Sequence, residues 1–319
     1  MPADISPADF LERLYQHTSG VVVGESHASV ASKKLIIDNL PTLAEQNVKT
    51  LYLEHLLSDL HQADLDDFLD TGQMSKRLLH DLQALDKGHQ TDPKGIYTFE
   101  KLVIKAQQQG IEIRAIDCLA SYHLKGLANE TSTTRQQMMN FFASRTVRRH
   151  QDVMGFHKWI ALVGNSHSNT FMDAVPGLAE LEGGIGLRVK DVLPGASHGI
   201  VRDPGEALPL DLGKAKVHIQ GDYRVEIEVP RSRPVTRPRS IEKRLAKPGM
   251  FLIEQNADGL QIIVHRSRDS QIYRTPVNTD AQGKLSVDRP SWVPVHLKAF
   301  DDMNALTVAL RDMNLSRVE

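Results

Sequence analysis

Near its amino terminus the chain reads Val21-Val22-Val23-Gly24-Glu25-Ser26-His27, a β-branched run that ends in glycine and is followed at once by ionisable residues. β-Branched residues favour strands, and a glycine commonly closes them. The next segment, residues 28–46, carries apolar residues at helical spacing. We therefore expect a strand, a loop and a helix in this order.

The same order of elements recurs along the first half of the chain. Further strands are predicted at Thr50–Leu53, Ile111–Asp117 and Trp159–Gly164, each preceded by a helical pattern. Strands that alternate with helices are joined by right-handed crossovers into a parallel sheet. We predict an α/β fold with a largely parallel sheet and flanking helices, which short strands after Gly186 extend antiparallel.

The composition is typical of an ordinary globular protein. Of the 319 residues, 40% are hydrophobic and 24% charged, and the formal net charge is −2, which gives no bias toward nucleic acid. A single cysteine excludes an intramolecular disulfide. Because no window approaches the roughly 18 apolar residues of a membrane span, we expect a soluble protein without a transmembrane segment.

The chain is longer than a typical single domain, so we expect two. Residues 231–239 are rich in proline and arginine, the composition of an extended linker. The interpretation is a catalytic domain over residues 1–230, a linker over 231–239, and a small α+β domain over 240–319.

Polar residues, many of them ionisable, stand at the ends of the four predicted strands. These residues are Glu25, Ser26 and His27, Glu54 and His55, Asp117 and Cys118, and Asn165, Ser166 and His167. A lone polar loop residue indicates little, but four strands that end in such groups favour a shared site, since ligands bind beyond the carboxyl ends of parallel strands.

The chemistry predicted for this site is acid–base catalysis. Glu25 and His27 lie two positions apart and can hold and activate a water, while Glu54 shares or orients the proton. His167 then acts as a proton donor or stabilises an oxyanion. We expect no cofactor, although two histidines and two glutamates leave a divalent metal such as zinc, manganese or cobalt as an alternative.

Two nucleophiles are less favoured. Ser26 lies beside His27, but the Gly-x-Ser-x-Gly elbow that exposes a nucleophilic serine is broken by Ala28. Cys118 follows a predicted strand, where a lone cysteine is more often a small core residue.

At these motifs the sequence resembles the superfamily of TIKI-type proteases, erythromycin esterase-like hydrolases and ChaN-like haem-binding proteins, and most of all the Ras/Rap-specific endopeptidase domain of bacterial multifunctional toxins. The likeness extends over about residues 18–230. It implies a peptidase whose site is Glu25, His27, Glu54 and His167, working without a bound metal on a host regulatory protein such as a small GTPase. The TIKI branch, by contrast, uses metal.

The carboxyl-terminal pattern of helix, three short strands and closing helix resembles a Src-homology-2 domain. Glu254 stands where that family has its phosphate-binding arginine, so we expect at most a shared architecture.

The sequence thus predicts a hydrolase, a peptidase rather than an esterase, that serves as a bacterial toxin or virulence effector and is secreted into a host or target cell. The alternative is a non-catalytic binding module of the same fold, for haem, a membrane or a protein partner.

Overall fold

The computed structural model describes residues 5–26, 29–89, 91, 95–122, 133–195, 199–210, 215–229, 245, 247–256, 259–266, 269–280, 284–287, 299–313 and 315–317. The chain divides into two compact units, Met1–Ser232 and Arg233–Glu319. The predicted linker at 231–239 lies outside the described residues.

Helices and strands alternate through most of the first unit. Its described helices are α1 (Pro7–Tyr15), α2 (Ala31–Asp38), α3 (Leu40–Glu45), α4 (Ser58–Thr71), α5 (Lys76–Gly88), α6 (Phe99–Gln108), α7 (Thr134–Met154), α8 (Asn165–Ser168) and α9 (Leu178–Glu182), with a 3-10 turn at Leu119–Tyr122. Its described strands are β1 (Gly20–Glu25), β2 (Val48–Leu57), β3 (Glu112–Asp117), β4 (Lys158–Gly164), β5 (Ile185–Val192), β6 (Ile200–Arg202), β7 (Glu206–Leu210), β8 (Ala215–Ile219) and β9 (Tyr223–Glu228).

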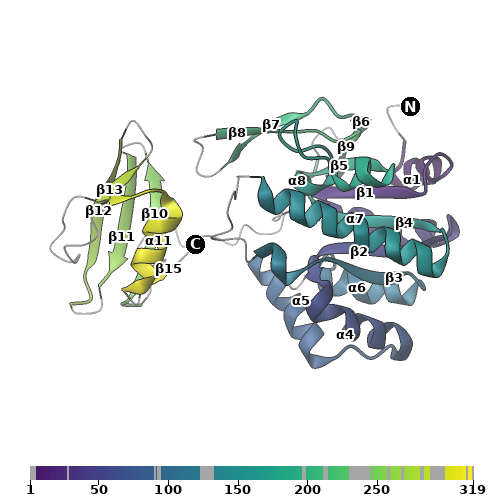
Figure 1. Cartoon of the computed structure of the whole chain (residues 1–319), viewed down its shortest axis with the longest axis horizontal. Helices are drawn as coiled ribbons and strands as arrows, with labels where there is room; N and C mark the ends of the chain where they lie inside the picture. The colour runs from purple at the N-terminus through teal and green to yellow at the C-terminus, as the bar shows by residue number, and fades with distance from the viewer. Residues whose placement is uncertain are drawn as a thin grey trace. The chain divides into compact units, whose positions relative to one another are not determined.

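The first unit is built on a sheet of seven described strands in the order β3-β2-β4-β1-β5-β9-β6 (Figure 1). β1 pairs in parallel with β4 on one side and with β5 on the other, and β2 pairs in parallel with β3 and β4. Helices carry the chain back between these strands, as parallel pairing requires. The predicted α/β fold with a largely parallel sheet is confirmed.

The expectation that the strands after Gly186 run antiparallel is wrong for β5 and β9. β5 is parallel to β1 and β9 is parallel to β5, whereas β6 pairs antiparallel with β9. Along the chain, helices α8 and α9 connect β4 to β5. The connection from β5 to β9 contains β6 and the β7–β8 hairpin. Both connections are long enough to return the chain to the edge where the preceding strand began.

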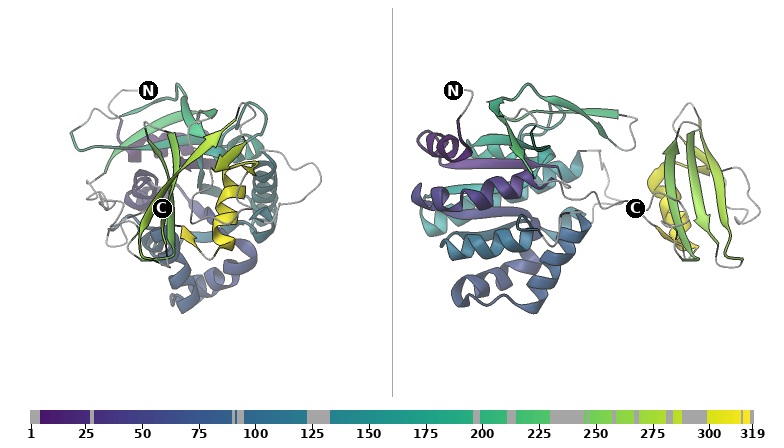
Figure 2. Two further views of the ribbon diagram at one scale, coloured as in Figure 1. Left: turned by 90° about the vertical axis from the view of Figure 1, so that its left-hand side faces the viewer. Right: turned by 180° about the vertical axis from the view of Figure 1, so that it is seen from behind.

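Helices cover both faces of this sheet. On one face, called here the α2 face, helices α1 to α6 pack on side chains that include Val21, Val23 and Leu53. On the other, the α7 face, helices α7 and α9 pack on Val22 and Tyr52. Figure 1 shows α7 in front of the strands, and the right panel of Figure 2 shows the purple and blue helices of the opposite face. None of the helices in the described part of the chain has the length and apolar character needed to cross a membrane.

β2 is longer than predicted and irregular at its carboxyl end. Leu53 pairs with Ala115 of β3, but the next pairing joins Leu57 to Asp117, so the strands fall out of register between these positions. Glu54 and His55, expected to follow the strand, therefore lie within it. Bulges of this kind redirect side chains, and they are common beside active sites.

The second unit has its own sheet, in the order β14-β13-β12-β11-β10-β15. Its described elements are β10 (Met250–Asn256), β11 (Gly259–His265), β12 (Ile272–Thr279), β13 (Leu285–Val287), β14 (Ala299–Phe300), α11 (Met303–Asp312) and β15 (Ser316–Arg317). Strands β10 to β14 pair antiparallel, and α11 packs on one face through Leu306 and Leu310. Glu254 lies in β10, and the helix predicted over residues 240–247 falls largely outside the described residues. The likeness to a Src-homology-2 domain stays a prediction.

Candidate active site

The carboxyl ends of β1, β4 and β2 lie side by side in the sheet. Val23 of β1 and Leu53 of β2 pair with the same residue of β4. Since side chains alternate along a strand, Glu25 and His55, two positions further on, lie on the α2 face, and Glu54 lies on the α7 face. This edge of the sheet therefore carries two clusters of ionisable groups, one on each face.

The cluster on the α2 face is centred on Glu25, which is almost completely buried. Its Oε2 accepts hydrogen bonds from Ser32 Oγ at 2.5 Å and Lys33 Nζ at 2.9 Å, and its Oε1 lies 2.9 Å from His55 Nε2. Burial alone would raise the pKa of Glu25, but His55, Lys33 and Ser32 outweigh it and lower the pKa from 4.5 to about 2. The carboxylate is therefore ionised at every physiological pH.

Gly164 explains how Glu25 and His55 meet. Glu25 pairs directly with Gly164 of β4, which separates β1 from β2. By the alternation along β4, a side chain at this position would point to the α2 face between Glu25 and His55. A glycine there leaves room for the contact.

His89 and Phe99 complete the cluster. The ring centroids of His55 and His89 are 5.4 Å apart, and Phe99 lies 4.5 Å from His55 and 5.7 Å from His89. Carboxylate oxygen and imidazole nitrogen are the donors that zinc and similar ions prefer. Among the described residues, one group of potential metal ligands is found, namely Glu25, His55 and His89, whose ligand atoms lie within 4.8 Å of one another.

The cluster on the α7 face pairs Glu54 with His167. Glu54 Oε2 accepts a hydrogen bond of 2.6 Å from the backbone N–H of Gly164, and Oε1 lies 3.5 Å from His167 Nε2. Both side chains are buried. Although burial raises the pKa of Glu54, His167 and His55 together with the N–H of Gly164 lower it, so that this carboxylate is also ionised.

Asn140 of α7 orients the ring of His167. Its Nδ2 donates to the carbonyl oxygen of Pro176 at 2.8 Å, so its Oδ1 faces His167 Nδ1 at 2.7 Å. An amide oxygen can only accept, and the proton of the neutral ring must therefore be on Nδ1. In the neutral ring Nε2 then carries the lone pair, and the negative charge of Glu54, 3.5 Å away, favours protonation of this nitrogen, as a general base requires.

Arg135 links this pair to the end of β3. Its Nη1 lies 3.3 Å from His167 Nε2, and its Nη2 lies 3.2 Å from Asp117 Oδ2. Burial raises the pKa of Asp117, although hydrogen bonds from Ser121 and the backbone of Cys118 and the charge of Arg135 counteract it. The guanidinium is thus held beside His167 by a carboxylate from a third strand.

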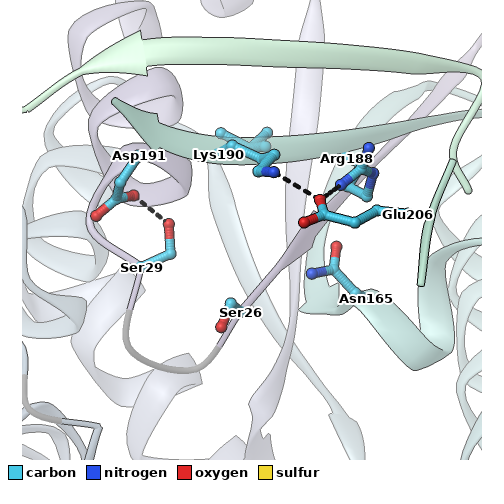
Figure 3. A pocket seen from close by; sticks show the side chains of 8 residues that line it. Ser26, Ser29, Asn165, Arg188, Lys190, Asp191 and Glu206 are labelled. Atoms are coloured by element: carbon cyan, nitrogen blue, oxygen red, sulfur yellow. Dashed lines mark hydrogen bonds and ion pairs between the residues drawn. The ribbon is translucent and has the colours of Figure 1, made fainter. Parts of the chain in front are cut away.

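A cavity of about 320 Å³ opens beside these strand ends (Figure 3). Ser26, which directly follows β1, and Asn165, which directly follows β4, line one side of it. Arg188 and Lys190 of β5 line the other side, and both donate to Glu206, at 2.7 and 2.5 Å. The cavity therefore lies where a parallel sheet commonly binds its ligand.

The structure does not bring the four predicted site residues together in one place. Glu54 and His167 come together as expected. Glu25 lies on the opposite face of the sheet and contacts His55 instead, and His27 lies outside the described residues. The single shared site expected from the sequence is thus two adjoining clusters, connected through the consecutive residues Glu54 and His55.

The site also contains Lys33, His89, Arg135 and Asn140, which the sequence did not single out, and His55, which the sequence placed at a strand end without a catalytic role. His55 had a usable signal, because it stands two positions after the last apolar residue of its strand, as Glu25 does. The others lie on helices or in the connections between them, and no short motif identifies them.

Comparison with known proteins gives a sequence match to a toxin. No family model matches the chain. The multifunctional-autoprocessing repeats-in-toxin of Vibrio vulnificus is 29% identical over 157 residues, which span 48% of this chain and 3% of the toxin. The chain therefore covers only a small fraction of this relative's length. This match confirms the resemblance to a bacterial multifunctional toxin that the strand-end motifs indicated.

Similar solved structures include bacterial effectors. The crystal structure of RRSP, a MARTX toxin effector domain from Vibrio vulnificus CMCP6, matches with 26% identity and a TM-score of 0.48, over 58% of this chain and 36% of that one. The type III effector HopBA1 matches with 16% identity and a TM-score of 0.46, over 72% of this chain and 97% of that one.

Proposed function

We propose that residues 1–230 form a hydrolase domain of a bacterial toxin or effector, and that this domain cleaves a peptide bond in a host protein. The observation that carries the proposal is the position of His167, which Asn140 holds with Nε2 toward Glu54 at the carboxyl edge of the parallel sheet. The sequence match to the Vibrio vulnificus toxin supports the effector role.

In the proposed reaction His167 is the general base. Its Nε2 takes a proton from a water molecule, and the resulting hydroxide attacks the carbonyl carbon of the scissile peptide. The negative charge of Glu54 stabilises the imidazolium that forms. Arg135, 3.3 Å from Nε2, supplies N–H donors for the developing oxyanion.

Glu25 and His27 have secondary roles in this reaction. Both oxygens of Glu25 already contact protein groups, so we propose that Glu25 positions the end of β1 rather than activating water. His27 enters the proposal on the sequence alone, as the acid that protonates the leaving amine. His167 then releases its proton to solvent and His27 takes one up, so that both histidines return to their starting states.

The substrate follows from the resemblance rather than from the site. We propose a host small GTPase, reached after secretion into the host cell, with one of its segments bound in the cavity beside Ser26 and Asn165.

Cleavage of purified small GTPases tests the proposal directly. New termini are detected by mass spectrometry after incubation with the full chain, with His167→Ala, and with Glu54→Gln. We expect both variants to lose at least about 100-fold in rate. The matched control is His80→Ala, because this side chain is 81% exposed. Undiminished cleavage by folded His167→Ala would overturn the assignment.

The second candidate is a binding module of the same fold. This candidate is favoured by the contacts of Glu25, whose two carboxylate oxygens lie against Lys33 and His55 as in a structural ion pair. Under this candidate no substrate yields new termini, and a ligand such as haem, detected by its absorption band, binds equally to wild type and His167→Ala.

A further inference from the structure

The cluster on the α2 face has the donors and the geometry of a metal site. Glu25 comes from β1, His55 from β2, and His89 directly follows α5, so three separate elements bring one carboxylate and two imidazoles together. Their ligand atoms lie within 4.8 Å of one another, and Glu25 Oε1 is 2.9 Å from His55 Nε2. Around a tetrahedral zinc ion two ligand atoms lie about 3.4 Å apart, so metal binding requires Glu25 Oε1 and His55 Nε2 to separate by about half an ångström and the three ligand atoms to close around the ion.

The groups around Glu25 support the same interpretation. Ser32 and Lys33 both donate to Oε2, which fixes the carboxylate with Oε1 on the side of His55. Ligating carboxylates in metalloproteins are commonly oriented in this way by hydrogen bonds to the second oxygen.

Phe99 forms an apolar wall on one side of the cluster. Phe99 is fully buried, and its ring packs on both imidazoles. Lys33 Nζ lies 4.5 Å from the centre of the same ring. Its positive charge opposes a cation at the site, and the carboxylate of Glu25, which accepts from Lys33 Nζ at 2.9 Å, offsets that charge.

We propose that Glu25, His55 and His89 bind one divalent transition-metal ion of the zinc class, with a position left for water. Two histidines and a glutamate are a known ligand set for zinc with an open fourth position, and imidazole donors select against magnesium and calcium. This site lies on the opposite face of the sheet from Glu54 and His167, and metal binding to it is not a step of the proposed hydrolysis.

Cobalt binding provides a readout that does not depend on activity. The full chain, without an affinity tag, is stripped with a chelator and titrated with Co²⁺, and bound metal is counted by mass spectrometry. We expect one ion per chain, a visible absorption spectrum of nitrogen–oxygen coordination, and displacement by Zn²⁺. His55→Ala and His89→Ala should each weaken binding at least about 100-fold.

Two further variants of the chain serve as controls. His80→Ala, remote from the cluster and exposed, should bind Co²⁺ as wild type does. Because His55 is buried and its replacement can impair folding, His89→Gln is measured as well, with circular dichroism as the check of fold. Absence of stoichiometric Co²⁺ in wild type, or equal binding by folded His89→Ala, overturns the proposal.

Discussion

At the scale of single residues, Glu25 links the stability of the protein to pH. Its pKa is about 2 in the folded chain and 4.5 in the reference state, so the folded carboxylate holds its proton less tightly than the unfolded one. The stabilisation that Glu25 provides is therefore complete above about pH 4.5 and is lost as the pH falls toward 2. This carboxylate makes the α2 face sensitive to acid.

Replacement of Glu25 tests this linkage. Glu25→Gln leaves Lys33 buried without its partner, and we expect a loss of about 3–5 kcal/mol in the free energy of unfolding at pH 7. Urea unfolding between pH 3 and 7 should then show a shallower acid dependence than in wild type. The exposed Glu12→Gln is the control and should keep the wild-type slope. An unchanged slope in Glu25→Gln would refute the coupling.

Asn140 is a positioning residue for the proposed base. Its carbonyl oxygen accepts from Nδ1 of His167, and Asn140→Ala removes this acceptor. For Asn140→Ala we expect kcat to fall about 100-fold with little change in KM. Asn140→Asp, whose carboxylate also accepts from Nδ1, should recover most of the rate. Equal losses in both variants would indicate a structural role instead.

At the scale of elements, Gly24 determines how closely α8 approaches β1. The sequence predicted that the strand closes at this glycine, but Gly24 lies inside β1. A Cβ at Gly24 would lie 2.8 Å from both Asn165 Oδ1 and Ser168 Oγ. We expect Gly24→Ala to lower the free energy of unfolding by about 1–3 kcal/mol. Gly88→Ala, whose Cβ would meet nothing within 4 Å, should be close to neutral in the same denaturation experiment.

Elements with strong local signals were predictable from the sequence. α6 begins after Thr98, whose side chain accepts from the N–H of Lys101, and ends before Gly110, which has a φ of +68°. These are local capping interactions, and the residue types at the helix ends predict them. The direction of β5 and β9 was not predictable in this way, because it depends on where long connections return the chain.

The site was predictable only in part, for a related reason. The motifs identified Glu54 and His167 because both stand at strand ends, where a parallel sheet collects its functional groups. Which face each residue occupies depends on the register between neighbouring strands, and this register is long-range information. Glu25 and His55 therefore meet on a face that no single motif indicates.

At the scale of the whole molecule, each compact unit has apolar cores of its own. The first unit contains the cores of the α2 and α7 faces. In the second, Phe251, Ile262 and Leu310 belong to a core formed within residues 251–310. A unit that buries its own apolar surface has the main requirement for folding alone.

We therefore expect residues 1–230 to fold and to retain any hydrolysis of the full chain. Calorimetry of the full chain, of residues 1–230 and of residues 240–319 tests this. Because the cores are separate, the full chain should show two transitions, each within a few degrees of the melting temperature of the matching fragment. His167→Ala should lower the rate of hydrolysis by the same factor in the full chain and in residues 1–230. A fragment that fails to unfold cooperatively, or one combined transition in the full chain, would show that the units depend on each other for stability.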